Sequence, residues 1–196
     1  WLRESDLALA METLAEYDAP LLVHAELPGP LERAAASLPS TLDARAYARY
    51  LASRPPEAEI DAIALLVREC ARTSARTHVV HLSAAGALDL LTRAKETDLP
   101  FTAETTPHYL KLEAEAIPDG ATAFKCAPPI REHENRERLW KGLREGLVDL
   151  VVTDHSPCTP ELKKLEIGSF EDAWGGIASL QFGLAVVWIE ARKRGV

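Results

Sequence analysis

The stretch Thr77-His78-Val79-Val80-His81-Leu82 indicates the fold, because it is a short, largely apolar run of the kind that forms a buried strand. Near its end lies His81, whose imidazole can bind a metal. Runs that are apolar on nearly every residue are typical of strands buried in a parallel sheet. Apolar residues between such runs recur at helical spacing. The further strands are expected over residues 20–24, 100–104 and 149–154, and the helices over 5–17, around 60–67, and over 84–97, 135–145 and 176–193.

This alternation predicts an α/β fold with a parallel sheet that is covered on both faces. An open doubly wound sheet and a (β/α)8 barrel both satisfy the pattern. The open sheet usually carries a glycine-rich phosphate turn after its first strand, whereas His24-Ala25-Glu26 follows here. A barrel is therefore favoured, but closure needs about eight strands. We expect the C-terminal half of a (β/α)8 barrel.

Composition excludes several classes of protein. The chain has 196 residues, is 47% hydrophobic and carries a formal net charge of −8, which indicates one or two folded domains and argues against nucleic-acid binding. Three widely spaced cysteines form neither a disulfide framework nor a zinc pattern and indicate reduced thiols in the cytoplasm. The most apolar stretch, 177–189, is too short for a membrane span of roughly 20 residues and is expected to be a buried helix.

Three of the four expected strands end in a side chain that can bind a metal. His24 closes the first, His81 the second and Asp154 the fourth. The carboxyl ends of barrel strands converge on one mouth, where active sites of this fold lie. Imidazole and carboxylate are ligands that zinc prefers. The sequence therefore predicts a metal site at this mouth.

Each of these residues also has a plainer interpretation. A histidine at a strand end can be a hydrogen-bonded structural residue, and an aspartate there can cap the next helix. Three such residues at equivalent strand ends favour the metal site. Since residues two apart in a strand share a face, His81 is expected with Val79, Asp154 with Val152, and His78 on the opposite face as a non-ligand.

The segments around these residues resemble a known family. They are ETTPHYL at 104–110, FKCAPPIR at 124–131, VTDHSPC at 152–158 and AWGGIASLQ at 173–181. Together they are similar to the cyclic amidohydrolases, which include dihydroorotases, hydantoinases and allantoinases, and the likeness is strongest to the allantoinases. It covers essentially the whole chain.

The resemblance implies an enzyme that hydrolyses a cyclic amide with the help of metal ions. The implied reaction is ring opening of allantoin to allantoate, a step of allantoin degradation in purine metabolism. A dihydroorotase, a hydantoinase or a dihydropyrimidinase is the alternative within the family. The alternative from another class is a non-catalytic scaffold protein similar to dihydropyrimidinases. Retention of His24, His81 and Asp154 at the strand ends argues against a scaffold, which does not need metal ligands.

The resemblance also implies two divalent metal ions, most simply zinc, with cobalt, manganese or iron as options. His24 and His81 match the histidines on one metal. Asp154 matches the carboxylate on the other metal, which also accepts and returns the proton. The family's carboxylated lysine is expected upstream of this chain, so Lys125 is not its counterpart.

Further site residues are implied by the same motifs. The backbone of Cys126, Ala127 and Gly175 matches the groups that hold the substrate ring. His108 and His155 match histidines that lie beside the metal site without binding the metals. No serine nucleophile is indicated, because there is no GxSxG turn.

The resemblance covers only part of a catalytic barrel over residues 1–196. The first strands, which carry a His-x-His pair, and the small β domain have no counterparts here, so half of six expected metal-binding residues are present. We therefore expect the isolated chain to be inactive and the full-length protein to be active. The implied partners are a small ureide substrate and, in the full-length protein, further copies in a dimer or tetramer, with no nucleic acid and no membrane.

Overall fold

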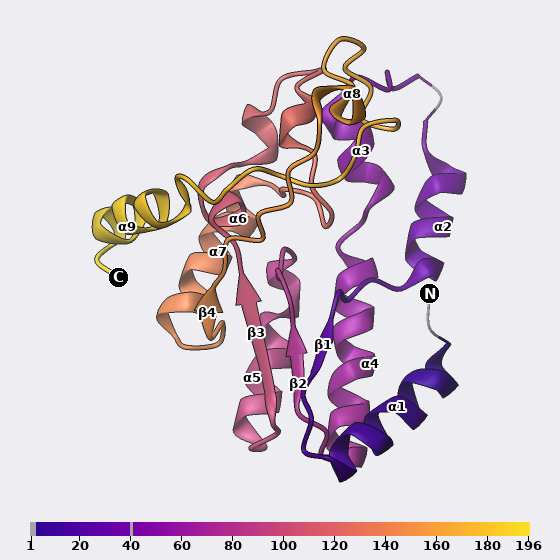
Figure 1. The fold of residues 1–196 in the computed structure, drawn as a ribbon, viewed down its shortest axis with the longest axis vertical. Helices are drawn as coiled ribbons and strands as arrows, with labels where there is room; N and C mark the ends of the chain where they lie inside the picture. Colours follow the sequence, from indigo (N-terminus) through magenta and orange to yellow (C-terminus); the bar gives the residue numbers. More distant parts are fainter. Residues whose placement is uncertain (1–2, 40) are drawn as a thin grey trace.

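The computed structural model describes residues 3–39 and 41–196, and in this part of the chain four strands form one parallel sheet (Figure 1). Strands adjacent in sequence are also adjacent in space, in the order β1-β2-β3-β4. The strands are β1 (Leu21–Val23), β2 (Thr77–Val79), β3 (Phe101–Thr105) and β4 (Leu150–Val151). The prediction of a parallel α/β sheet is confirmed, and all four carboxyl ends lie along one edge.

Helices connect these strands, as the apolar spacing predicts. The helices are α1 (Glu4–Glu16), α2 (Pro28–Ser37), α3 (Tyr47–Ser53), α4 (Glu57–Thr73), α5 (Leu88–Glu96), α6 (Pro107–Lys111), α7 (His133–Arg144), α8 (Pro160–Lys163) and α9 (Gly183–Arg194), with 3-10 turns at Ala85–Ala87, Ala114–Ala116 and Thr122–Phe124. Contacts join α4 to β2, α5 to β3 and α1 to α4. Helix α7 ends as predicted beside Gly146, whose φ of +70° suits glycine just after a helix.

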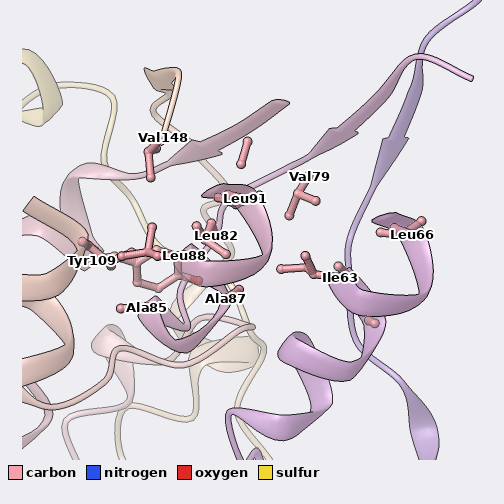
Figure 2. Packing of buried hydrophobic residues seen from close by; sticks show 14 of the residues in the cluster. Ile63, Leu66, Val79, Leu82, Ala85, Ala87, Leu88, Leu91, Tyr109 and Val148 are labelled. Atoms are coloured by element: carbon pink, nitrogen blue, oxygen red, sulfur yellow. The ribbon is translucent and has the colours of Figure 1, made fainter. Parts of the chain in front are cut away.

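The main core lies between α4, α5 and the sheet. Figure 2 shows Ile63 and Leu66 of α4 beside Val79 of β2, and these side chains are at most 2% exposed. The opposite face of the sheet differs from the prediction, because Leu22 is 62% and Leu150 43% exposed. Within the described residues, helices therefore cover one face and leave these apolar side chains uncovered on the other.

The last helix corrects a second expectation. Helix α9 begins at Gly183 rather than at residue 176, because residues 176–182 form a bridge and turns. The expected buried helix is wrong, since Leu184 is 84% and Trp188 62% exposed. No helix within residues 3–39 and 41–196 is long and apolar enough to cross a membrane.

Truncation of Ile63 tests the core. We expect Ile63→Ala to lower the free energy of unfolding by about 2–5 kcal/mol, because the fully buried side chain leaves a cavity against the sheet. Urea unfolding followed by circular dichroism measures this loss. Leu9→Ala on α1 is the control, because Leu9 is 65% exposed and should change stability by about 0.5 kcal/mol or less. Equal effects of the two changes would contradict the assignment of the core.

Candidate active site

His24 and His81 meet at the carboxyl edge of the sheet. The register pairs Val23 with Val79, so the chain leaves β1 and β2 at neighbouring points. His24 Nδ1 lies 3.1 Å from His81 Nε2, and the two rings stand edge to face. The structure thus brings together two of the three predicted metal ligands, which are 57 residues apart in the sequence.

Strand alternation alone does not account for the place of His81. Val79 is buried in the core, but His81 has a φ of +43°, in the left-handed region that ends the extended conformation. Its side chain consequently contacts His24 instead of following Val79 into the core. His78 bonds through Nδ1 to Thr102 Oγ1 at 2.7 Å and through Nε2 to Glu104 Oε2 at 3.0 Å, so both its nitrogens are engaged.

A buried carboxylate holds the other side of the His24 ring. His24 Nε2 lies 2.8 Å from Glu26 Oε2, and Arg54 Nη1 donates to the same oxygen at 2.5 Å. The Glu26 side chain is 1% exposed. Burial acts to raise its pKa, but the hydrogen bond from His24 and the charge of Arg54 outweigh burial and lower it. An ionised Glu26 accepts the Nε2 proton of His24 and leaves the Nδ1 lone pair directed at His81.

The histidine pair fits the chemistry of a metal site. Two nitrogens bound to one tetrahedral zinc, each at 2.0–2.1 Å, lie about 3.3 Å apart, close to the spacing of His24 Nδ1 and His81 Nε2. Burial and the nearby His24 lower the pKa of His81 to about 4, which favours the neutral, metal-binding imidazole. A carboxylate on the far nitrogen, as Glu26 provides, is typical of metal-binding histidines. No three histidine, cysteine or acidic side chains of the described residues form a complete metal site.

Asp154 follows β4 on the same edge, with a φ of +41°. Burial, and secondly the charge of Glu104, raise its pKa, while the charge of His24 lowers it. The influence of His24 places Asp154 within electrostatic reach of that ring, although His24, His81 and Asp154 are not close enough to form one metal site.

The two predicted substrate-binding segments lie against each other. A Cβ on Gly175 would be 3.5 Å from Ala127 Cβ and 3.8 Å from the Ala127 nitrogen. At Gly176 a Cβ would lie 2.3 Å from the Ser156 carbonyl oxygen, so only glycine fits there. In the described part of the chain, the backbone N–H groups of Ala127 and Gly175 have no hydrogen-bond partner. Two segments that each carry an amide without a partner therefore touch at Ala127 and Gly175.

Cys126, the third predicted substrate contact, is more enclosed. Cys126 is 2% exposed, and its carbonyl oxygen accepts a hydrogen bond from the Tyr50 hydroxyl at 2.6 Å. Burial raises the pKa of the Cys126 thiol to about 12, so it stays protonated. The side chain therefore packs, and within the described residues the backbone N–H groups of both Cys126 and Ala127 lack a hydrogen-bond partner.

The two other predicted histidines occupy different surroundings. His155 is exposed, and its Nδ1 accepts the backbone N–H groups of Ser179 and Leu180 at 3.0 and 3.1 Å, so it fixes that turn. His108 is 4% exposed, and neither of its ring nitrogens has a partner among the described residues. Burial and the nearby His81 lower its pKa to about 3.

The chain is similar to several known proteins over nearly its whole length. No family model matches the chain. It is 49% identical over 97% of its length to "Allantoinase, mitochondrial" from Aquarana catesbeiana, and 48% identical over 99% of its length to an allantoinase from Streptomyces avermitilis. In structure it is similar to a D-hydantoinase (dihydropyrimidinase) from Thermus sp., with a TM-score of 0.87 and 26% sequence identity. The superposition covers 98% of this chain and 43% of the hydantoinase.

The chain belongs to the cyclic amidohydrolase family, and its four parallel strands are part of an amidohydrolase (β/α)8 barrel. Within that family, the curated relatives that it resembles at 46–49% identity are allantoinases. The chain spans 38% and 42% of the length of the first two of these relatives.

His108 gives the site a testable pH dependence. The unfolded chain takes up a proton at His108 near pH 6.5, whereas the folded chain does so only near pH 3, so acidification through this range favours unfolding. Wild-type stability relative to His108→Phe should therefore fall by up to about 1.4 kcal/mol per pH unit below pH 6.5.

Urea unfolding between pH 5 and 8 measures this difference. His133→Phe is the control, because 60% of the His133 side chain is exposed, and it should keep the wild-type slope. A His108→Phe variant with the same slope as wild type would contradict a buried, neutral His108.

Proposed function

We propose that the protein carrying this chain hydrolyses a cyclic amide and that its substrate is allantoin, which opens to allantoate. The observation that carries the proposal is the pair of His24 and His81, with nitrogens 3.1 Å apart at the rim where amidohydrolase barrels bind substrate. The similarity to curated allantoinases supports the choice of substrate. Residues 1–196 would form part of the catalytic barrel, and the remaining strands would come from other parts of the full-length protein.

Two divalent metal ions would be needed, most simply zinc, with cobalt, manganese or iron as options. His24 Nδ1 and His81 Nε2 would hold one ion and Asp154 the other, together with a carboxylated lysine and further histidines from outside these residues. When bound, such ions act as Lewis acids that lower the pKa of water from 15.7 to roughly 7. Glu26 would keep the His24 ring in the required tautomer, because its carboxylate accepts the Nε2 proton.

The chain's own residues would move the proton and hold the ring. Asp154, whose pKa burial raises, would accept the proton of the attacking water and return it to the leaving ring nitrogen. The free amides of Ala127 and Gly175 would donate hydrogen bonds to a ring carbonyl. Cys126 would not act as a thiolate nucleophile, since burial keeps its thiol protonated.

A hydantoin or dihydropyrimidine ring is the second candidate substrate, because the fold also matches a hydantoinase. A non-catalytic scaffold is disfavoured, because a buried carboxylate that orients one histidine toward another serves metal binding rather than packing. The expected partners remain a small ureide and other copies of the full-length protein in a dimer or tetramer. A cytoplasmic location is part of the proposal, although one relative is named a mitochondrial protein.

Substrate choice and the need for the whole barrel can be tested together. The full natural polypeptide with zinc, cobalt or manganese should open allantoin faster than hydantoin, dihydrouracil or dihydroorotate, as followed by ring loss in the ultraviolet or by chromatography of products. Residues 1–196 alone should show no turnover, because they supply only part of the metal site. Faster opening of another ring would displace allantoin, and robust turnover by residues 1–196 would refute the need for other segments.

Removal of one imidazole tests the metal site directly. His24→Ala in the full polypeptide should lower the bound metal from two ions toward one per chain and reduce turnover by roughly 100-fold or more, because one ion loses a ligand. Elemental analysis after gel filtration gives the stoichiometry. His78→Gln is the control, because His78 bonds to Thr102 and Glu104 and should leave two ions bound. Full metal content in His24→Ala would exclude His24 as a ligand.

A further inference from the structure

A buried lysine connects the two segments that carry the free amides. Lys163, the last residue of α8, is 7% exposed. Its Nζ donates to the Lys125 carbonyl oxygen at 2.7 Å and to the Trp174 carbonyl oxygen at 3.1 Å. One ammonium group thus joins the peptide two residues before Ala127 to the peptide directly before Gly175.

Further contacts connect the same two segments. Lys125 Nζ donates to the Ala173 carbonyl oxygen at 2.6 Å, and the Gly176 N–H donates to the Lys125 carbonyl oxygen at 3.0 Å. Backbone and side-chain donors thus connect Lys125, just before Ala127, to residues on either side of Gly175. The spacing of the two free amides is therefore set by these donors rather than by regular secondary structure.

Packing alone does not account for a lysine at position 163. No acidic side chain in residues 3–39 and 41–196 forms an ion pair with Lys163. A buried ammonium that faces neutral carbonyls keeps its desolvation cost without a counter-charge, and burial lowers its pKa accordingly. A methionine of similar length would fill the space at lower cost. An ammonium does what methionine cannot, because its three donors can reach two carbonyls in different directions.

We infer that Lys163 is a positioning residue that holds the backbone amides of Ala127 and Gly175 at the spacing required to bind the ring of the substrate. This inference rests on the proposed function. Without the ammonium, the Trp174 carbonyl loses its donor, and the peptide that precedes Gly175 is released. Ring binding weakens as a result, while the histidine pair, which follows β1 and β2, and Asp154, which follows β4, keep their places.

The test compares Lys163→Met with Lys141→Met in the full natural polypeptide. Lys141 lies on α7 with 69% of its side chain exposed and is the matched control. For the cyclic amide that wild type opens, Lys163→Met should raise KM about 10-fold with kcat within about threefold, since ground-state contacts to the ring are lost. Its melting temperature should equal or exceed that of wild type. Lys141→Met should match wild type in all three measurements.

Hydrogen–deuterium exchange supplies a readout that needs no substrate. In Lys163→Met, peptides covering residues 125–127 and 174–176 should exchange faster, while peptides from β1 and β2 should not change. Absence of turnover by wild type would refute the proposed function alone, and the exchange result would still decide the role of Lys163.

Three outcomes would overturn the inference: unchanged KM in Lys163→Met, unchanged exchange of those peptides, or failure of the variant to fold. Failure to fold would show that the ammonium serves the fold as a whole. Lys163→Arg gives an independent check, because a planar guanidinium reaches the two carbonyls less well and should give a KM between those of wild type and Lys163→Met.

Discussion

The parallel register of the sheet is the constraint on which the site depends. Pairing of Val23 with Val79 brings the ends of β1 and β2 to the same height, and pairing of β3 with both β2 and β4 extends that edge. Residues that follow the strands then meet across the edge although they are far apart in sequence. A shift of one residue between β1 and β2 would separate His24 from His81 and expose Val79.

Buried charged groups then fix the loops that leave this edge. Glu26 orients the His24 ring. Glu59 on α4 is 1% exposed and accepts the N–H groups of Ser83 and Ala84, both at 2.7 Å, so it anchors the chain just after His81. Burial raises the pKa of Glu59 to about 7, although the charge of Arg131 opposes this rise. Lys163 holds residues 125 and 174 through their carbonyl oxygens. In each case a buried polar side chain satisfies backbone or ring atoms that packing alone would leave unpaired.

Two of the three residues predicted to bind metal, His24 and His81, are in contact in the fold, whereas the surroundings of the sheet differ from the prediction. His24, His81 and Asp154 are predicted because each ends an apolar run, and Gly175 because its segment resembles a motif of the cyclic amidohydrolases. Glu26 could have been noticed two residues after His24, where a carboxylate is well placed to orient an imidazole. Lys163 gave no such signal, because its partners are backbone carbonyls 38 and 11 residues away. The prediction of a buried helix at α9 is wrong, because apolar composition does not specify which surface covers a helix, and Leu184 and Trp188 are exposed.

The sequence by itself determined the alternation of strands and helices, the parallel sheet and the kind of chemistry at the strand ends. These properties follow from local patterns: apolar runs, helical spacing and the donor atoms of single side chains. Only the tertiary structure decided that the His81 side chain turns toward His24, that Glu26 and Arg54 hold the far side of that ring, and that Lys163 joins two loops. Such contacts depend on backbone dihedrals and on pairings between distant segments. A pattern of residue types cannot specify them, because the same pattern is compatible with several arrangements in space.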